Sequence, residues 1–138
     1  MNVKEIWSNE DFDEMSWHDN YVYSLSFPSD DLRMSFEIDY IFEWELNPIS
    51  NLYQYWISHC WLTFLNVLNL KVDLDYKKST GLAILEIRRV SSRPSENKKM
   101  VIWTFVIETD KGNISFDATG FIQKIDKKPI LSQSQKLL

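Results

Sequence analysis

The chain has 138 residues, a length that suits one domain with one hydrophobic core, and we draw a single domain over residues 1–138. Aromatic residues make up 14% of it and there are only three Gly and four Pro, a composition that favours β-strands over disorder. The net charge is −5, whereas proteins that bind nucleic-acid phosphates usually carry an excess of basic residues, so nucleic acid is not a favoured partner.

Compartment and membrane contact can be judged from three features. Cys60 is the only cysteine, which excludes an internal disulfide framework and favours a reducing compartment. The acidic N-terminal residues lack the apolar run of a secretory signal. Leu46 to Leu70 holds no Asp, Glu, Lys or Arg, but polar residues are scattered through it, so we expect buried core and no membrane span. We therefore expect a cytoplasmic protein.

The first half of the chain predicts one helical turn followed by two strands. Ser8 or Asn9 can cap a short turn near Glu10 to Met15. Tyr21 to Phe27 then alternates with a period of two, and a polar Pro-containing run breaks it. Leu32 to Phe42 alternates apolar with mostly polar side chains over eleven residues, which predicts the clearest strand and a hairpin with its predecessor.

The middle of the chain carries a segment whose spacing fits both a helix and a strand. Tyr53 to Leu65 satisfies helical spacing as well as strand spacing. Its aromatic and Thr content, together with the clean alternation of Leu68 to Leu74 just after it, favours strands.

The second half predicts strands separated by regular turn signals. We expect strands over Leu82 to Val90 and Met100 to Thr109, with a polar loop from Ser91 to Lys99 between them. Gly112 lies in a hairpin turn, and Gly120 permits a bend. The remaining expected elements are the strands 114–118 and 121–125 and a polar tail from Pro129. About eight or nine short strands predict an all-β fold, an antiparallel sandwich or barrel.

Three motifs resemble those of an uncharacterised bacterial protein family. The family shows a Trp-His-Asp-Asn opening, an Asp-Ile-Asp-Tyr-like strand and a Gly-x-Ile-x-Phe-x-Ala-x-Gly-Phe-x-Gln ending. The matching segments here are Trp17 to Asn20, Glu37-Ile38-Asp39-Tyr40 followed by Trp44, and Gly112 to Gln123. The chain departs from the pattern at Glu37, where the family has Asp. The resemblance implies one conserved β unit and no particular activity.

The Trp17-His18-Asp19-Asn20 segment is the first candidate site. A histidine near carboxylates can act as a general base or a ligand-binding group. His18 and Asp19 are adjacent, however, so on a strand they would point to opposite faces. The structural alternative is favoured: Asp19 and Asn20 cap a turn while Trp17 packs beneath it.

Carboxylates and one thiol are the other chemical candidates. Asp39 is expected on the polar face of the longest predicted strand, with Glu37 and Glu43 on the same side. A solvated sheet face explains these carboxylates without a metal site, so we expect no metal and no cofactor. Cys60 stands in an apolar run and is expected to be a core residue.

Charge and aromatic content lead to the functional hypotheses. Residues 1–50 carry twelve acidic and two basic side chains, whereas residues 51–138 carry eight acidic and thirteen basic. Trp44, between Glu43 and Glu45, is the best candidate for an exposed aromatic in an acidic patch. Since no catalytic motif is present, we expect a small interaction module, of inhibitor or immunity type, for a protein with a basic surface. The alternative is a ligand-binding or weakly enzymatic β-barrel with an aromatic-lined pocket, and an unpaired edge strand makes a homodimer plausible.

Overall fold

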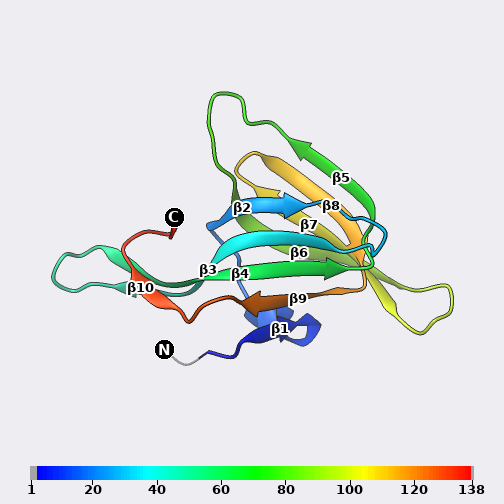
Figure 1. Cartoon of the computed structure of the whole chain (residues 1–138), viewed down its shortest axis with the longest axis horizontal. Coiled ribbons are helices and arrows are strands. Elements are labelled where there is room, and N and C mark those ends of the chain that lie inside the picture. Colours follow the sequence, from blue (N-terminus) through cyan, green and yellow to red (C-terminus); the bar gives the residue numbers. More distant parts are fainter. Residues whose placement is uncertain (1–2, 138) are drawn as a thin grey trace.

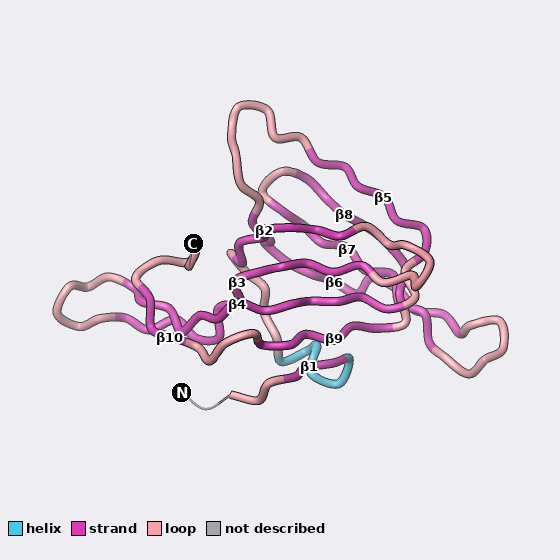
Figure 2. Tube along the Cα trace, in the orientation of Figure 1, coloured by secondary structure: helices cyan, strands magenta, loops and turns pink. Residues whose placement is uncertain are grey.

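The computed structural model describes residues 3–137 and is built almost entirely from antiparallel strands (Figures 1 and 2). A single 3₁₀ turn, η1 (Asn9–Glu14), follows the first strand. The ten strands within this range are β1 (Ile6–Ser8), β2 (Asn20–Ser26), β3 (Met34–Leu46), β4 (Tyr53–Leu65), β5 (Leu68–Leu74), β6 (Ala83–Pro94), β7 (Val101–Thr109), β8 (Gly112–Ala118), β9 (Gly120–Ile125) and β10 (Ile130–Ser132).

The strands form one sheet that folds over on itself. Their order is β1-β9-β4-β3-β2-β6-β7-β8-β5, and β10 pairs with the start of β4. Only two residue pairs, Asn20 with Ile84 and Tyr21 with Ala83, join β2 to β6. At the other corner, the single residue Thr119 separates β8 from β9. The two halves therefore face each other like the layers of a sandwich, and the strand order ends at β1 and β5 without closing.

Phe64 of β4 lies at the centre of the core between the two halves. Its ring centroid lies 5.1 Å from that of Phe105 and 4.6 Å from that of Phe116, both on the opposing half. Phe36 and Phe121 complete the cluster from the strands beside β4. All five side chains are at most 2% exposed. Edge-to-face contacts of this kind add to the free energy gained by burying apolar area.

The fold class is confirmed, and the ambiguous segment 53–65 is a strand. In β4, Cys60, Leu62 and Phe64 are buried and alternate with the less buried His59 and Trp61. The helical alternative was wrong. Apolar residues at every second position fill one face of a strand, and when further apolar residues lie between them the same run also matches helical spacing. The turn at Gly112 and the break at Gly120 lie where the sequence indicated them.

Two expected loop regions contain strands instead. β6 continues through Pro94, so the loop expected from Ser91 is limited to the residues between β6 and β7. The tail after Pro129 contains β10, which pairs antiparallel with β4. The end of β6 is polar and β10 has only three residues, so neither shows a long apolar alternation. Each is a strand because its backbone pairs with a neighbouring strand.

The largest correction concerns the uncharged stretch from Leu46 to Leu70, which was expected to be core throughout. Its first part instead forms the tip of a hairpin that projects from the sheet at the left of Figure 1. Ile49 is 96% exposed and Leu52 is 68% exposed there. Burial begins near Ile57, where β4 enters the sandwich.

A bulge in β3 also changes which side chains share a face. The register with β4 shifts between Ile41 and Glu43. Asp39 pairs with His59 whereas Glu43 pairs with Trp56, and positions three apart on β4 point to opposite faces. Glu43 therefore lies on the other side from Asp39, contrary to the simple alternation.

No helix within residues 3–137 has the length and the apolar character that crossing a bilayer requires.

Candidate functional site

The projecting hairpin, which we call the arm (residues 43–56), has an ordered tip. Asn47 organises this tip, because its side-chain Oδ1 accepts hydrogen bonds from the backbone N–H of Ile49 (2.9 Å) and of Ser50 (3.3 Å). Its backbone N–H also donates to the carbonyl of Leu52 at 2.9 Å. Asn readily forms such local side-chain turns. The tip therefore presents Ile49 on a backbone that is already fixed.

Trp44 is the centre of an aromatic cluster at the base of the arm. Its ring packs edge-to-face on Tyr55 at 4.8 Å and on Tyr53 at 6.1 Å, and it stacks on the imidazole of His18 at 6.3 Å. Trp44 remains 40% exposed. Trp and Tyr held rigidly at a surface are the residues that most often anchor protein interfaces.

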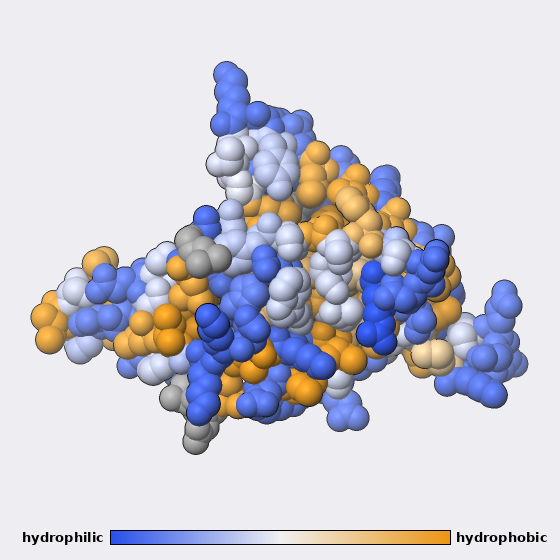
Figure 3. Space-filling model, viewed as in Figure 1, coloured by the Kyte–Doolittle hydropathy of each residue, from blue (hydrophilic) through white to orange (hydrophobic). Residues whose placement is uncertain are grey.

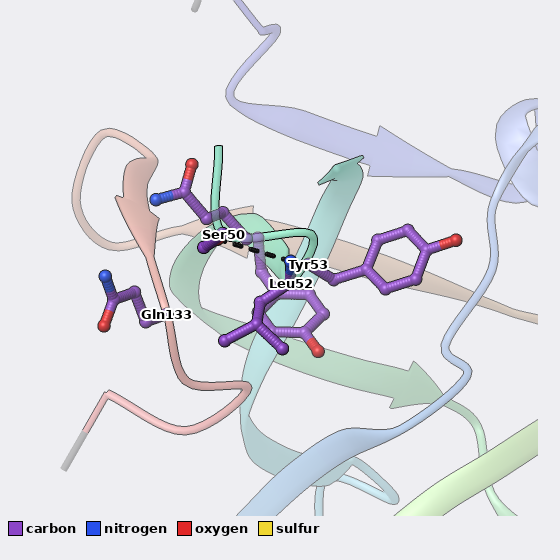
Figure 4. Close-up of a pocket in the computed structure, with 6 residues that line it drawn as sticks. Ser50, Leu52, Tyr53 and Gln133 are labelled. Atoms are coloured by element: carbon purple, nitrogen blue, oxygen red, sulfur yellow. Dashed lines mark hydrogen bonds between the residues drawn. The ribbon is translucent and has the colours of Figure 1, made fainter. Parts of the chain in front are cut away.

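A hollow of about 430 Å³ lies along one side of the arm. Leu52 and Tyr53 line it from the arm, and Gln133 faces them from the segment that follows β10 (Figure 4). Hydrophobic patches lie among hydrophilic side chains on this end of the molecule, at the left of Figure 3. The arm thus combines an exposed tip, an aromatic base and a concave side.

The charge of the arm is acidic. Glu43 and Glu45 are its only charged residues. Both are exposed on the β3 strand of the hairpin, and Glu45 accepts a hydrogen bond from the indole N–H of Trp56 at 3.0 Å. The apolar and aromatic side chains of the arm are therefore bordered by two negative charges, and the arm contains no Lys or Arg.

A second polar region lies on the side of β2, β3 and β4 that points away from the core, which we call the outer face. Asp39 is its deepest residue and is completely buried. Its carboxylate accepts hydrogen bonds from the Tyr23 hydroxyl and from the backbone N–H of Leu137, the latter at 2.8 Å to Oδ2. Its other oxygen, Oδ1, has no hydrogen-bond partner.

His59 lies beside Asp39 on the outer face and bridges two carboxylates. Its Nδ1 is 3.1 Å from Asp126 and its Nε2 is 3.3 Å from Glu37. A neutral imidazole carries one N–H and can donate to only one of them, whereas the protonated ring can donate to both. His59 on β4 thus links Glu37 on β3 to Asp126, the residue that follows β9.

The outer face is crossed by residues 133–137, which we call the strap. Figure 1 shows the segment after β10 turning back towards the start of β2. The Lys136 ammonium lies 4.2 Å from the ring centroid of Tyr21, and Gln135 donates to the carboxylate of Asp19 at 3.4 Å. These contacts, with that of Leu137 to Asp39, hold the strap against the sheet.

The five residues singled out from the sequence do not form one site. Trp17 is core, 3% exposed, and its indole donates to Gln123 at 2.8 Å. His18, Asp19 and Trp44 do meet: the His18 ring stacks on Trp44 and its Nε2 lies 3.3 Å from Asp19. Asp39 was expected on a solvated face, and this expectation was wrong because a segment distant in sequence covers it.

The structural interpretation of Cys60 fits the geometry. Its side chain is completely buried in the core, and burial raises the pKa of its thiol to about 12. A thiol in this state is a poor nucleophile.

Several residues of the outer face were not singled out from the sequence. Lys136 contacts the rings of Tyr21 and Tyr23 from the strap, and His59 bridges two carboxylates beside them. The alternation of Tyr21 and Tyr23 was the available signal, because it predicts two aromatic rings on one face.

Within residues 3–137, no three His, Cys, Asp or Glu side chains are arranged to hold a metal ion. Comparisons of the chain with protein-family models, with curated proteins and with solved structures give no match.

Proposed function

We propose that the protein is an interaction module that uses the arm to bind a partner protein, and that the partner presents an apolar contact bordered by Lys or Arg. The observation that carries the proposal is the ordered tip with Ile49 at 96% exposure. A monomer gains no stability from holding an isoleucine in water, whereas a partner pocket can bury it.

The rigidity of the arm supports the proposal energetically. Association must offset the ordering of side chains and loops, and a preformed surface reduces that cost. Asn47 fixes the tip, and the rings of Tyr53 and Tyr55 pack on Trp44 at the base. Little conformational freedom therefore remains to be lost when a partner binds.

The charge pattern supports a basic partner. The arm carries only Glu43 and Glu45, and residues 1–50 carry twelve acidic against two basic side chains. Opposite potentials accelerate encounter and disfavour wrong partners, and the effect weakens as salt rises. One role that fits is covering and neutralising a basic enzyme or toxin.

The test places a photo-crosslinking amino acid at position 49, with position 90 as the matched control. Val90 is also apolar and is 51% exposed, but it lies on β6. A protein captured from position 49 and not from position 90 is purified, and its affinity for the unmodified chain is measured at several salt concentrations. Failure to capture any protein at position 49 above the level at position 90 would refute the proposal.

Variants of the arm complete the test on the purified partner. Ile49→Asp and Trp44→Ala should each weaken binding at least about tenfold, which corresponds to about 1.4 kcal/mol. Val90→Asp should leave affinity unchanged, and higher salt should weaken binding of the parent chain. Equal affinities for all four proteins would contradict the proposal.

Self-association is a second candidate, supported by the exposed edge of the sheet. β5 ends the strand order, and its Leu68 and Val72 are 52% and 39% exposed. Two such edges can pair across a twofold axis. Sedimentation at rising protein concentration tests this, and Val72→Lys should shift the chain towards monomer. A parent chain that stays monomeric at every concentration excludes this candidate.

A further inference from the structure

We propose that the outer face around Asp39 is a binding site for a peptide segment that carries a lysine, and that the strap occupies this site within the chain. The site uses no residue of the arm. It therefore stands whether or not the arm binds a partner.

Three successive strap residues show what the site recognises. Gln135 donates its amide N–H to Asp19 at 3.4 Å, and the Lys136 ammonium lies over the Tyr21 ring at 4.2 Å. The backbone N–H of Leu137 donates to Asp39 at 2.8 Å. These three contacts come from a side-chain amide, a side-chain ammonium and a backbone N–H, so the site binds a cation and a peptide backbone together.

The unsatisfied oxygen of Asp39 shows that the strap does not use the whole site. Asp39 is completely buried, and Oδ1 has no hydrogen-bond partner. Among the ion pairs of residues 3–137, none includes Asp39. Burying a carboxylate without a cation is unfavourable unless donors compensate it. A ligand that brings a donor to Oδ1 would therefore bind better than the strap.

The rest of the face is already arranged for a cation. The rings of Tyr21 and Tyr23 pack edge-to-face at 4.9 Å, and the Lys136 ammonium lies 6.0 Å from the second ring. Tyr23 is held by its hydrogen bond to Asp39. Glu37 lies on the same face beside His59 and adds negative charge. A lysine that approaches this face meets two aromatic rings and several carboxylates.

The experiment uses the full chain with the strap contacts removed by Lys136→Ser and Leu137→Pro, since proline lacks the donating N–H. The probe is an acetylated peptide with the sequence of residues 133–138. Its binding is monitored by the NMR chemical shifts of the Tyr21 and Tyr23 rings. A linked segment has an effective concentration in the millimolar range, so the titration extends to about 10 mM. We expect saturable shifts in the released chain and at least tenfold weaker binding to the parent chain, where the strap competes.

Matched variants decide whether the binding is specific. In the peptide, serine in place of the lysine should weaken binding at least tenfold. In the released chain, Asp39→Asn or Tyr21→Leu should do the same, while Asp73→Asn on the exposed strand β5 should change nothing. Two variants of the site are used so that one remains if the other fails to fold. No shift at either tyrosine, or equal binding of the lysine-free peptide, would overturn the inference.

Discussion

The backbone N–H of Leu137 donates a hydrogen bond to the carboxylate of Asp39 at 2.8 Å, across 98 positions of sequence. Asp39 is completely buried, although it lies on the polar side of its strand. Alternation along β3 correctly indicates that Asp39 points away from the core. It carries no information about a distant segment that returns to cover it.

Two replacements of Asp39 should distinguish the effect of its buried charge on the free energy of unfolding from the effect of its hydrogen bonds. In Asp39→Asn, the amide oxygen can still accept from Tyr23 and Leu137, and the unpaired buried charge is gone. We expect its free energy of unfolding at pH 7 to lie within about 1 kcal/mol of the parent, whereas Asp39→Leu should lose about 1–3 kcal/mol because both donors lose this acceptor. Urea denaturation measures both values. Equal losses for the two variants would show that the charge itself is stabilising.

The carboxylate of Asp117 should make stability depend on pH. Burial alone would raise its pKa, but hydrogen bonds from Asn69 (2.7 Å), Thr104 (2.7 Å) and Arg93 (3.0 Å) outweigh burial and lower the pKa. A pKa lowered by folding contributes stability above the unfolded value, about 3.9, that is lost as pH falls through the folded value.

Denaturation of the parent and of Asp117→Asn between pH 7 and pH 2 tests this contribution. The variant should be less stable at pH 7, and its stability should fall less below about pH 4, because the carboxylate that must be protonated is absent. Asp73→Asn, on the exposed strand β5, is the control and should follow the parent. Parallel pH curves for parent and Asp117→Asn would contradict the assignment.

Gly112 in the β7–β8 hairpin and Gly120 at the start of β9 should differ in their tolerance of a side chain. Gly112 has φ +135°, and a Cβ there would overlap the backbone carbonyl oxygen of Asp73 on β5. A Cβ on Gly120 would meet the side-chain amide of Asn9, which can move at the cost of its hydrogen bonds. We expect Gly112→Ala to cost about 2 kcal/mol or more and Gly120→Ala clearly less. Thermal denaturation of both variants checks the order, and a reversed order would refute the explanation.

Local signals account for much of the fold. Alternation placed β3, β5 and β8, and Gly112 marked the hairpin between β7 and β8. These features depend on residues close in sequence, where the period of two and turn chemistry act directly. The position of Trp44 in an exposed acidic setting also followed from its neighbours Glu43 and Glu45.

Features that depend on contacts between residues distant in sequence could not be predicted from the sequence. The uncharged run from Leu46 is equally compatible with core and with a projecting hairpin, because burial depends on what packs against it. The bulge between Ile41 and Glu43 reverses which side chains share a face, and no Gly or Pro marks it. The arm and the strap, the two features on which the proposals rest, both belong to this class.

The tip of the arm offers a prediction that isolates local order from global stability. Asn47→Ala removes the acceptor for the N–H groups of Ile49 and Ser50, while Asn47→Asp keeps an oxygen in the same place. We expect faster amide exchange at positions 49 and 50 in the alanine variant and near-parent exchange in the aspartate variant. The global free energy of unfolding should change by less than about 1 kcal/mol in both, because the tip lies outside the core. If the alanine and aspartate variants exchange equally fast, Asn47 does not organise the tip, and the arm is not preorganised for a partner by this residue.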